Sequence, residues 1–273
     1  PYTPLLRSRL AHPFIIESRP GAGGNLGTEM VAKSPGDGYT LLSTGTPNTI
    51  NASYYDKLNF DFIHDIVPVA GVTHGPLFMV VNPSVPAQSV PEFIAYAKAN
   101  PGRIAMASSG NGTAPHLSGE LFKMMAGVDM LHVPYRGARA AMTAVFTGEA
   151  HVLFDPIPSS IEPIKAGRLK PLAVTSLTRA DALPELPTVN DTVPGYEANG
   201  WQGIGVPKAT PVEIIGKLNR EINAALADPA MREKILNLGA AVYPASPEEA
   251  GKLILSDTEK WAKVVKFAGL KAE

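Results

Sequence analysis

The chain has 273 residues, more than one hydrophobic core usually supports and enough for two lobes. Its 24 basic and 25 acidic residues give a net charge of −1, which lacks the basic excess that nucleic-acid binding requires. Without cysteine it can form neither disulfides, nor thiolate nucleophiles, nor Cys-ligated zinc sites. No stretch approaches the ~18 apolar residues of a membrane span, and no signal peptide opens the chain as given.

Short apolar runs alternate with amphipathic stretches along the chain. The apolar runs predict strands at residues 14–16, 39–42, 78–81, 104–107, 151–154 and 172–175. The periodic stretches predict helices near residues 24–34, 91–99, 115–126, 137–147, 211–227 and 247–268. Strands that alternate with helices are typical of parallel or mixed sheets covered by helices, and ligands of such sheets lie at the carboxyl ends of the strands.

Two extended segments, 67–76 and 201–207, are bounded by glycine and proline and are expected to cross between two lobes. If both cross, lobe 1 consists of residues 1–75 and 206–273, and lobe 2 consists of residues 76–205. A double crossing favours a hinge over two independent domains.

The glycine-rich segment from Arg19 to Gly27 follows an expected strand and opens an expected helix. It departs from the dinucleotide fingerprint because Leu26 stands where the third glycine belongs, and no acidic residue follows at the usual distance. A phosphate loop would need Gly-Lys-Ser/Thr, which is absent. Two interpretations stay open: a glycine turn for close helix–sheet packing, or backbone amides that contribute to an anion site.

The turn from Ser108 to His116 is the most informative stretch of the chain. It follows the predicted strand 104–107 and precedes a helix, with Pro115 suited to the first turn and Thr113 a candidate cap. A helix N-terminus with free N–H groups and flanking hydroxyls favours an anion, whereas an ordinary capped helix start is the alternative. The candidate ligand-binding residues of this turn are Ser108, Ser109, Gly110, Gly112 and Thr113.

Three further turns place polar groups at the ends of predicted strands. Arg136 could bind a carboxylate in bidentate fashion or be a solvated surface charge, and Tyr135 offers an aromatic wall with a polar tip. Asp155 could accept a hydrogen bond from the ligand or serve a purely structural role. The first lobe repeats the arrangement, with the candidate residues Thr44, Thr46 and Asn48.

The chain also contains the residue types of a catalytic triad in Ser109, His116 and Asp155, so a serine-type hydrolase acting on a small ester or amide is the alternative function. Ser109 lacks the G-x-S-x-G elbow, and His116 follows it by seven residues at a helix start. The six histidines show no H-E-x-x-H or i,i+4 pair. We therefore expect no catalysis, no metal and no cofactor.

Five motifs then occur in order along the chain: Arg19–Asn25 (RPGAGGN), Asp37–Leu42 (DGYTLL), Ser108–Thr113 (SSGNGT), His132–Tyr135 (HVPY) and Leu183–Thr188 (LPELPT). Together they strongly resemble the Bug/TctC family, the substrate-binding components of tripartite tricarboxylate transporters, over nearly the whole chain. The resemblance implies an α/β fold, a two-lobed clamp like the periplasmic binding proteins, with a central sheet flanked by helices in each lobe. It also implies a periplasmic location, a small organic carboxylate as ligand, and membrane permease subunits as partners. We expect the protein itself to be a monomer.

Within the resemblance, the turn 108–113 matches the carboxylate-binding turn of the second lobe, and Asp155 matches a variable position that helps to select substrates. The turn 44–48 matches a first-lobe turn that faces the cleft, and Arg136 stands where lysine is common. The start of the chain departs from the family pattern, because a further strand and a loop of the type PFxxGGxxD are expected there and are missing. The nearly neutral set of turns favours a small dicarboxylate over a citrate-like triacid, whose extra charge would be poorly compensated.

Overall fold

The computed structural model describes residues 9–10, 12–19, 21–237 and 240–271. The chain divides into two compact units: unit 1 comprises residues 1–74 and 201–273, and unit 2 comprises residues 75–200. The chain passes from unit 1 to unit 2 within β2 (Ile66–Val81) and returns within β7 (Asn199–Pro207). Both strands contain the extended segments expected to cross between lobes. Among the described residues, no helix is long and apolar enough to cross a membrane.

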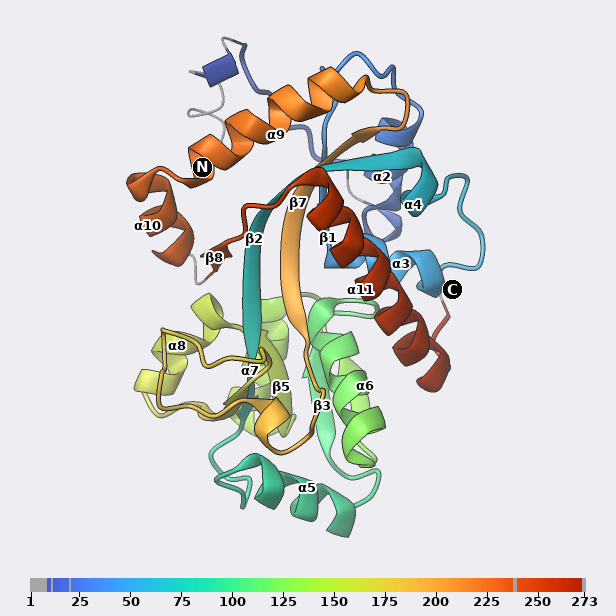
Figure 1. Cartoon of the computed structure of the whole chain (residues 1–273). Helices are drawn as coiled ribbons and strands as arrows, with labels where there is room; N and C mark the ends of the chain where they lie inside the picture. The colour runs from blue at the N-terminus through green and yellow to red at the C-terminus, as the bar shows by residue number, and fades with distance from the viewer. Residues whose placement is uncertain (1–8, 11, 20, 238–239, 272–273) are drawn as a thin grey trace. The chain divides into compact units, whose positions relative to one another are not determined.

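Unit 1 is built on a sheet in the order β1, β7, β2 and β8 (Figure 1). β1 (Leu42–Gly45) lies antiparallel to β7, and β8 (Ala241–Val242) lies antiparallel to the first part of β2. The helices of unit 1 are η1 (Ala22–Gly24), α2 (Asn25–Ala32), α3 (Thr46–Tyr54), α4 (Phe62–Asp65), α9 (Val212–Leu226), α10 (Pro229–Asn237) and α11 (Pro247–Phe267).

Two apolar clusters hold the helices of unit 1 to its sheet. In the first, residues of α9 and α10, including Ile222 and Met231, pack against Val69 and Val206 of β2 and β7. The second, which includes Trp201, joins residues of α2, α4 and α11 to β1, β2 and β7. Helix α3 packs directly on α11. A helical layer therefore buries apolar side chains from both ends of the chain against this sheet.

Unit 2 carries a second sheet, in the order β6, β2, β5, β3 and β4. The last part of β2 runs antiparallel to β5 and β6, whereas β3 runs parallel to both β5 and β4. The carboxyl ends of β5, β3 and β4 therefore lie at one edge of the sheet. The strands with bounds not yet given are β3 (Ala105–Ser108), β4 (Leu131–Pro134), β5 (Val152–Pro156) and β6 (Lys170–Val174).

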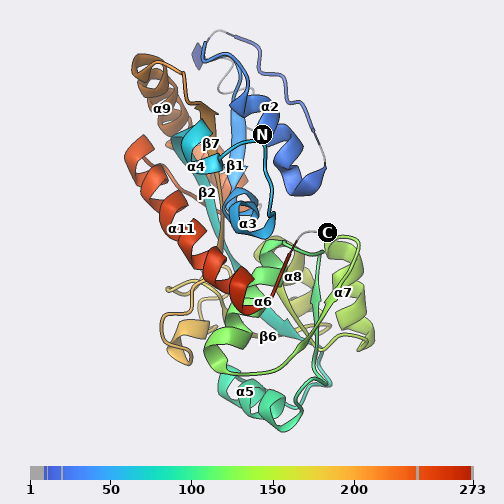
Figure 2. The same cartoon turned by 90° about the vertical axis from the view of Figure 1, so that its right-hand side faces the viewer.

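Helices cover this sheet on two sides (Figure 2). Residues of α7 and α8 pack with Phe78, Val80 and Leu153. Phe122 of α6 contacts the rings of Phe93 in α5 and Phe154 in β5. The helices of unit 2 are α5 (Val90–Ala99), α6 (Ala114–Ala126), α7 (Ala138–Thr147), α8 (Ile157–Lys165) and η2 (Val189–Asp191).

The structure corrects two of the strand predictions. Residues 12–19 form no regular structure, so the strand predicted at 14–16 is wrong, and Ile15 and Ile16 are 89% and 78% exposed. This apolar run has no neighbouring strand among the described residues, so no sheet pairing holds it as a strand. The strand predicted at 39–42 begins only at Leu42. Residues 1–8 and Pro20, which the predictions also included, lie outside the described residues.

Candidate functional site

Three turns of unit 2 meet at the edge where β3, β4 and β5 end. Each leads into a helix: β3 into α6, β4 into α7 and β5 into α8. Ser108 pairs with Pro134, and the carbonyl oxygen of Ser108 accepts a hydrogen bond from Tyr135 N at 2.9 Å. The structure thus brings the turn 108–113 together with Tyr135 on the neighbouring strand end, and Asp155 lies at the end of the adjacent strand on the other side.

The turn 108–113 depends on its glycines and on its own hydrogen bonds. Gly110 (φ 134°) and Gly112 (φ 71°) adopt backbone conformations that residues with a Cβ atom rarely adopt. Thr113 occupies the N-cap position of α6, as predicted, but its hydroxyl makes no cap hydrogen bond. It donates instead to the carbonyl oxygen of Gly110 at 2.7 Å. The hydroxyl of Thr113 therefore closes the turn.

Several backbone N–H groups of this turn are available for a ligand. Within the part of the chain that the structure describes, the amides of Ser109, Asn111 and Ala114 have no hydrogen-bond acceptor. Ser109 is half-buried, and its hydroxyl also lacks a partner among the described residues. Ala114 is the first residue of α6, where the helix dipole favours negative charge. Free N–H groups, a hydroxyl and a helix N-terminus together form the kind of site that binds a carboxylate.

Two histidines lie beneath this turn. Ser108 is fully buried, and its Oγ lies 2.6 Å from Nε2 of His132 in β4. Nδ1 of His116 in α6 accepts the N–H of Gly112 at 3.1 Å, and the two imidazole rings stack with their centroids 3.7 Å apart. Burial lowers the pKa of His116 to about 3 and that of His132 to about 4, so both are neutral at pH 7. The sequence does not predict this pair, because only the parallel register of β3 and β4 brings His132 to the turn.

The remaining candidates of unit 2 differ in exposure. Asp155 is 1% exposed, and its carboxylate accepts hydrogen bonds from the hydroxyls of Ser159 (2.5 Å) and Ser160 (2.7 Å) in α8. Burial raises the pKa of Asp155. Tyr135 donates to Glu149 at 2.9 Å, and burial together with Glu149 raises the pKa of Tyr135 to about 12. Arg136 is exposed and forms no ion pair with any described residue.

The candidates of unit 1 cluster at the start of α3. Thr46 Oγ1 accepts the N–H of Trp201 at 3.1 Å. Asn48 Oδ1 accepts the N–H of Gly45 at 2.9 Å, and its Nδ2 donates to Thr28 at 3.0 Å. Thr44 is 3% exposed and lies opposite a glycine, Gly203, in β7. The hydrogen bonds of Thr46 and Asn48 therefore connect the start of α3 to β1, to β7 and to Thr28 in α2.

The glycine-rich segment forms a turn before α2. Gly21, Ala22, Gly23 and Gly24 all have positive φ values, of 130°, 46°, 64° and 94°. The carbonyl oxygen of Gly23 accepts a hydrogen bond from Asn51 Nδ2 at 2.9 Å, which ties the turn to α3. These contacts support the interpretation of this segment as a glycine turn that links a loop to a packed helix.

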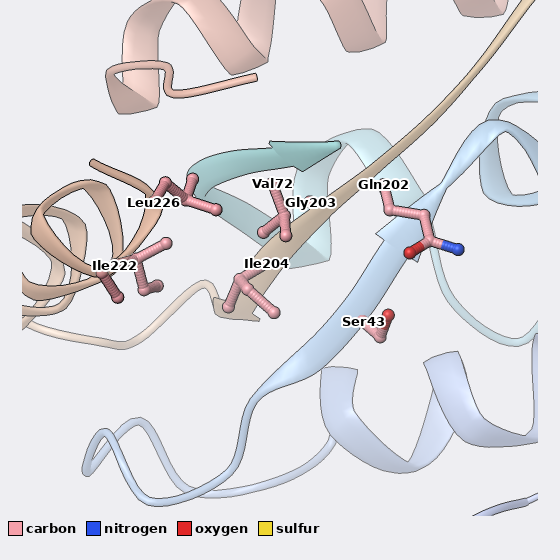
Figure 3. Close-up of a pocket in the computed structure, with 8 residues that line it drawn as sticks. Ser43, Val72, Gln202, Gly203, Ile204, Ile222 and Leu226 are labelled. Carbon is pink, nitrogen blue, oxygen red and sulfur yellow. The ribbon is translucent and has the colours of Figure 1, made fainter. Parts of the chain in front are cut away.

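A small apolar pocket of about 80 Å³ lies in unit 1, between the sheet and α9 (Figure 3). Ser43 and Gln202 lie at its rim, on β1 and β7, and Leu226 of α9 lies opposite. Because neighbouring residues of a strand point to opposite faces, Ser43 and the pocket lie on the other face of the sheet from Thr44. The pocket is therefore separate from the candidate residues of unit 1. Its remaining lining residues are Val72, Gly203, Ile204, Ile222 and Ala225.

The structure gives no geometric support to a triad. His116 Nδ1 is occupied by Gly112, and the recorded partners of Asp155 are serine hydroxyls of α8. Within the described residues, Ser109 has no hydrogen bond to His116 or to Asp155. The described residues also contain no group of three or more His, Cys, Asp or Glu side chains that could hold a metal ion.

Comparison with known proteins decides the family. The model of the tripartite tricarboxylate transporter family receptor matches residues 4–270. The chain belongs to this family, TctC/Bug. BugT of Bordetella pertussis is 35% identical over 269 residues, which cover 97% of this chain and 82% of BugT. Members of the TctC/Bug family are solute-binding receptors and not enzymes.

Solved structures of TctC/Bug relatives share the mixed α/β fold of periplasmic binding proteins. R. palustris Rpa4515 with adipate matches with a TM-score of 0.85 and 34% identity, over 98% of this chain and 91% of that one. The periplasmic binding protein BugD matches with a TM-score of 0.82 and 31% identity, over 99% and 92%. MatC (Rpa3494) from Rhodopseudomonas palustris with bound malate matches with a TM-score of 0.82 and 27% identity, over 96% and 91%.

Proposed function

We propose that this TctC/Bug receptor acts in the periplasm, where it captures a small dicarboxylate and delivers it to the membrane subunits of a tripartite transporter. The observation that carries the proposal is the turn 108–113 of unit 2, with the uncommitted amides of Ser109, Asn111 and Ala114 at the N-terminus of α6. Relatives with adipate and with malate support a dicarboxylate as the ligand class.

In this proposal, the turn 108–113 binds one carboxylate through neutral donors, and the hydroxyl of Ser109 adds a further donor. The hydroxyl of Ser108 is buried, and it stabilises the turn through its contacts with Gly110 and His132. The exposed Arg136 supplies a cation for a second carboxylate, with Tyr135 beside it. The ligand-binding residues proposed overall are Ser108, Ser109, Gly110, Gly112, Thr113, Asp155, Thr44, Thr46, Asn48, Tyr135 and Arg136.

The charges at this edge favour two carboxylates over three. Arg136 is the cation among the candidates, and each further carboxylate would need its own compensating donors. We expect titration calorimetry to show tighter binding of succinate or adipate than of citrate or benzoate. If citrate binds most tightly, the site compensates three carboxylates and the expected preference for two is wrong. If benzoate binds most tightly, contact with the ring of Tyr135 dominates recognition.

The same titrations locate the site. Ser109→Ala removes one donor to an anion, and the loss of about 1.5–3 kcal/mol corresponds to at least about 10-fold weaker binding. The matched control is Ser256→Ala on α11, where the hydroxyl donates only to the carbonyl oxygen of Leu253. Unchanged affinity in Ser109→Ala would show that the carboxylate does not bind at this turn.

We also propose that ligand binding closes the two units as lobes of a clamp, because β2 and β7 form a double connection between them. A ligand shifts such an equilibrium only by its preference for the closed form. Solution scattering should therefore show a smaller radius of gyration with saturating adipate than without it. An identical scattering profile in both conditions would exclude closure.

A further inference from the structure

The feature that the proposed function leaves unused is the stacked pair of His116 and His132. His116 lies in the first turn of α6 and is 0% exposed, and His132 lies in β4. Their rings are nearly parallel, with 12° between the planes and 3.7 Å between the centroids. Two neutral imidazoles can stack at this distance, whereas two imidazolium cations would repel each other.

Each histidine contacts a different part of the turn 108–113. His116 Nδ1 accepts the N–H of Gly112 at 3.1 Å. His132 Nε2 lies 2.6 Å from Ser108 Oγ, and this hydroxyl also contacts Gly110 through its carbonyl oxygen (3.1 Å) and its N–H (3.2 Å). The pair therefore contacts the turn near both of its ends, and the free amides of Ser109 and Asn111 lie between these contacts.

The turn needs such support because of its composition. Gly110 and Gly112 make its conformation accessible, but glycine also has more conformational freedom to lose than any other residue. A ligand that binds free amides loses affinity if it must first order them, whereas a turn held in advance avoids this cost. External contacts to Gly110 and Gly112 restrict the residues that are least restricted by themselves.

The contact to Gly112 also determines the tautomer of His116. Since Nδ1 accepts a hydrogen bond, the neutral ring carries its proton on Nε2. This Nε2 has no hydrogen-bond partner among the described residues, and the nearest carboxylate oxygen, on Glu120, is 3.8 Å away. Glu120 is itself paired with Lys123 at 2.9 Å. The ring is therefore held by Gly112 and by the stack on His132.

We propose that His116 and His132 are positioning residues, which hold the amides of the turn 108–113 in their ligand-binding conformation before the ligand arrives. The inference rests on the proposed function for the identity of the ligand, but the ordering of the turn can be measured without ligand. A purely structural role would instead stabilise unit 2 as a whole and leave the turn no more affected than the rest of it.

The chain offers conservative replacements and a matched control. Asparagine at position 116 places an amide oxygen where Nδ1 lies, and glutamine at position 132 places an amide where Nε2 lies, whereas leucine at either position removes the polar contact. His151 is the control, because its Nδ1 accepts the N–H of Ala105 at 2.9 Å. Ala105 starts β3, at the opposite end from Ser108. His151→Leu therefore removes the same kind of hydrogen bond away from the turn.

The experiment measures amide hydrogen exchange at Gly110, Gly112 and Thr113, the hydrogen-bonded amides of the turn, in the ligand-free proteins. It also measures the affinity of each protein for adipate and malate. In His116→Leu and His132→Leu, we expect exchange in the turn to accelerate at least about 10-fold relative to the core of unit 2, with affinity at least about 10-fold weaker. His116→Asn, His132→Gln and His151→Leu should keep the turn and the affinity of the parent protein. Unchanged exchange of the turn in both leucine variants would overturn the proposal.

The outcomes separate this inference from the proposed function. If the parent protein binds neither adipate nor malate, the proposed ligand class fails, and the exchange of the free turn still decides the role of the histidines. If a leucine variant does not fold, NMR of the parent protein decides instead. A scalar coupling between the Gly112 amide and His116 Nδ1 is the expected result, and a His116 ring protonated at Nδ1 at pH 7 would overturn the proposal.

Discussion

Asp257→Leu is expected to destabilise unit 1 by about 1–3 kcal/mol, because it removes the acceptor of a buried donor. The side chain of Asp257 in α11 is 2% exposed. Its Oδ2 accepts hydrogen bonds from Thr49 Oγ1 in α3 and from Trp201 Nε1 in β7, both at 2.9 Å. Leucine would leave Trp201 Nε1 buried without a partner, whereas Thr49 Oγ1 also donates to the carbonyl oxygen of Thr46 at 2.8 Å and keeps that hydrogen bond. Its Oδ1 also lies 2.7 Å from Lys260 Nζ.

The measurement is urea unfolding followed by tryptophan fluorescence. The only two tryptophans of the chain, Trp201 and Trp261, both belong to unit 1, so their signal reports the unfolding of that unit. Glu248→Gln is the matched control, because Glu248 lies on the same helix and its ion pair with Lys252 is exposed. We expect it to cost less than about 1 kcal/mol. Equal effects of the two substitutions would show that Asp257 does not anchor α11.

The sequence predicts the turn 108–116 and its helix well, for reasons that are local. The proline at position 115 and the apolar face of the following residues predict a helix over 115–126, and α6 spans Ala114–Ala126. The rule that ligands lie at the carboxyl ends of parallel strands also selects the edge where β3, β4 and β5 end. Both inferences need only neighbouring residues and a general rule of sheet topology.

Four described α-helices, α3, α4, α8 and α10, lie outside the predicted ranges. In α3 and α8 the local propensities oppose a helix. α3 is rich in threonine and asparagine, which favour caps and turns over helix interiors. It is held by tertiary contacts instead, such as those of Asn48 with Thr28 and of Thr49 with Asp257. α8 begins after Pro156 and contains Pro163, and prolines read as loop residues in a single sequence. In both helices, contacts far apart in the sequence outweigh the local preference.

The histidine pair escapes prediction for a different reason. His116 and His132 are sixteen residues apart and share no motif spacing that indicates contact. They meet only because β3 pairs with β4 in a parallel register that places His132 opposite Met106. Strand order and register are not visible in the sequence pattern. No sequence pattern therefore indicates that these two histidines contact each other or the turn 108–113.

The same two histidines predict that the free energy of unfolding of unit 2 falls as the pH drops below about 6.5. In the unfolded chain, both histidines have the ordinary pKa of 6.5, whereas in the folded protein burial lowers their pKa values to about 3 and about 4. Between these values the unfolded state binds more protons than the folded state. Stability is therefore fully present above pH 6.5 and is lost as the pH falls towards 4.

The expected magnitude follows from linkage. Well below pH 6.5, each histidine contributes a slope of up to about 1.4 kcal/mol per pH unit, so the pair together removes roughly 2–4 kcal/mol between pH 7 and pH 5. Lys123 adds to this effect, because its positive charge disfavours protonation of both rings. Glu120 faces His116 from the same helix and is paired with Lys123, so it compensates little of the added charge.

Urea unfolding at several pH values, followed by circular dichroism, measures the slope in the parent protein and in the double variant His116→Asn with His132→Gln. The variant has no imidazole at either position, so its free energy of unfolding should lose the part of the pH dependence that belongs to this pair, whatever its stability at pH 7. The control His151→Asn removes a histidine away from the stack and should retain the parent slope. A double variant as pH-dependent as the parent would show that the two histidines are not held neutral in the folded protein, and the stacked arrangement beneath the turn would have to be abandoned.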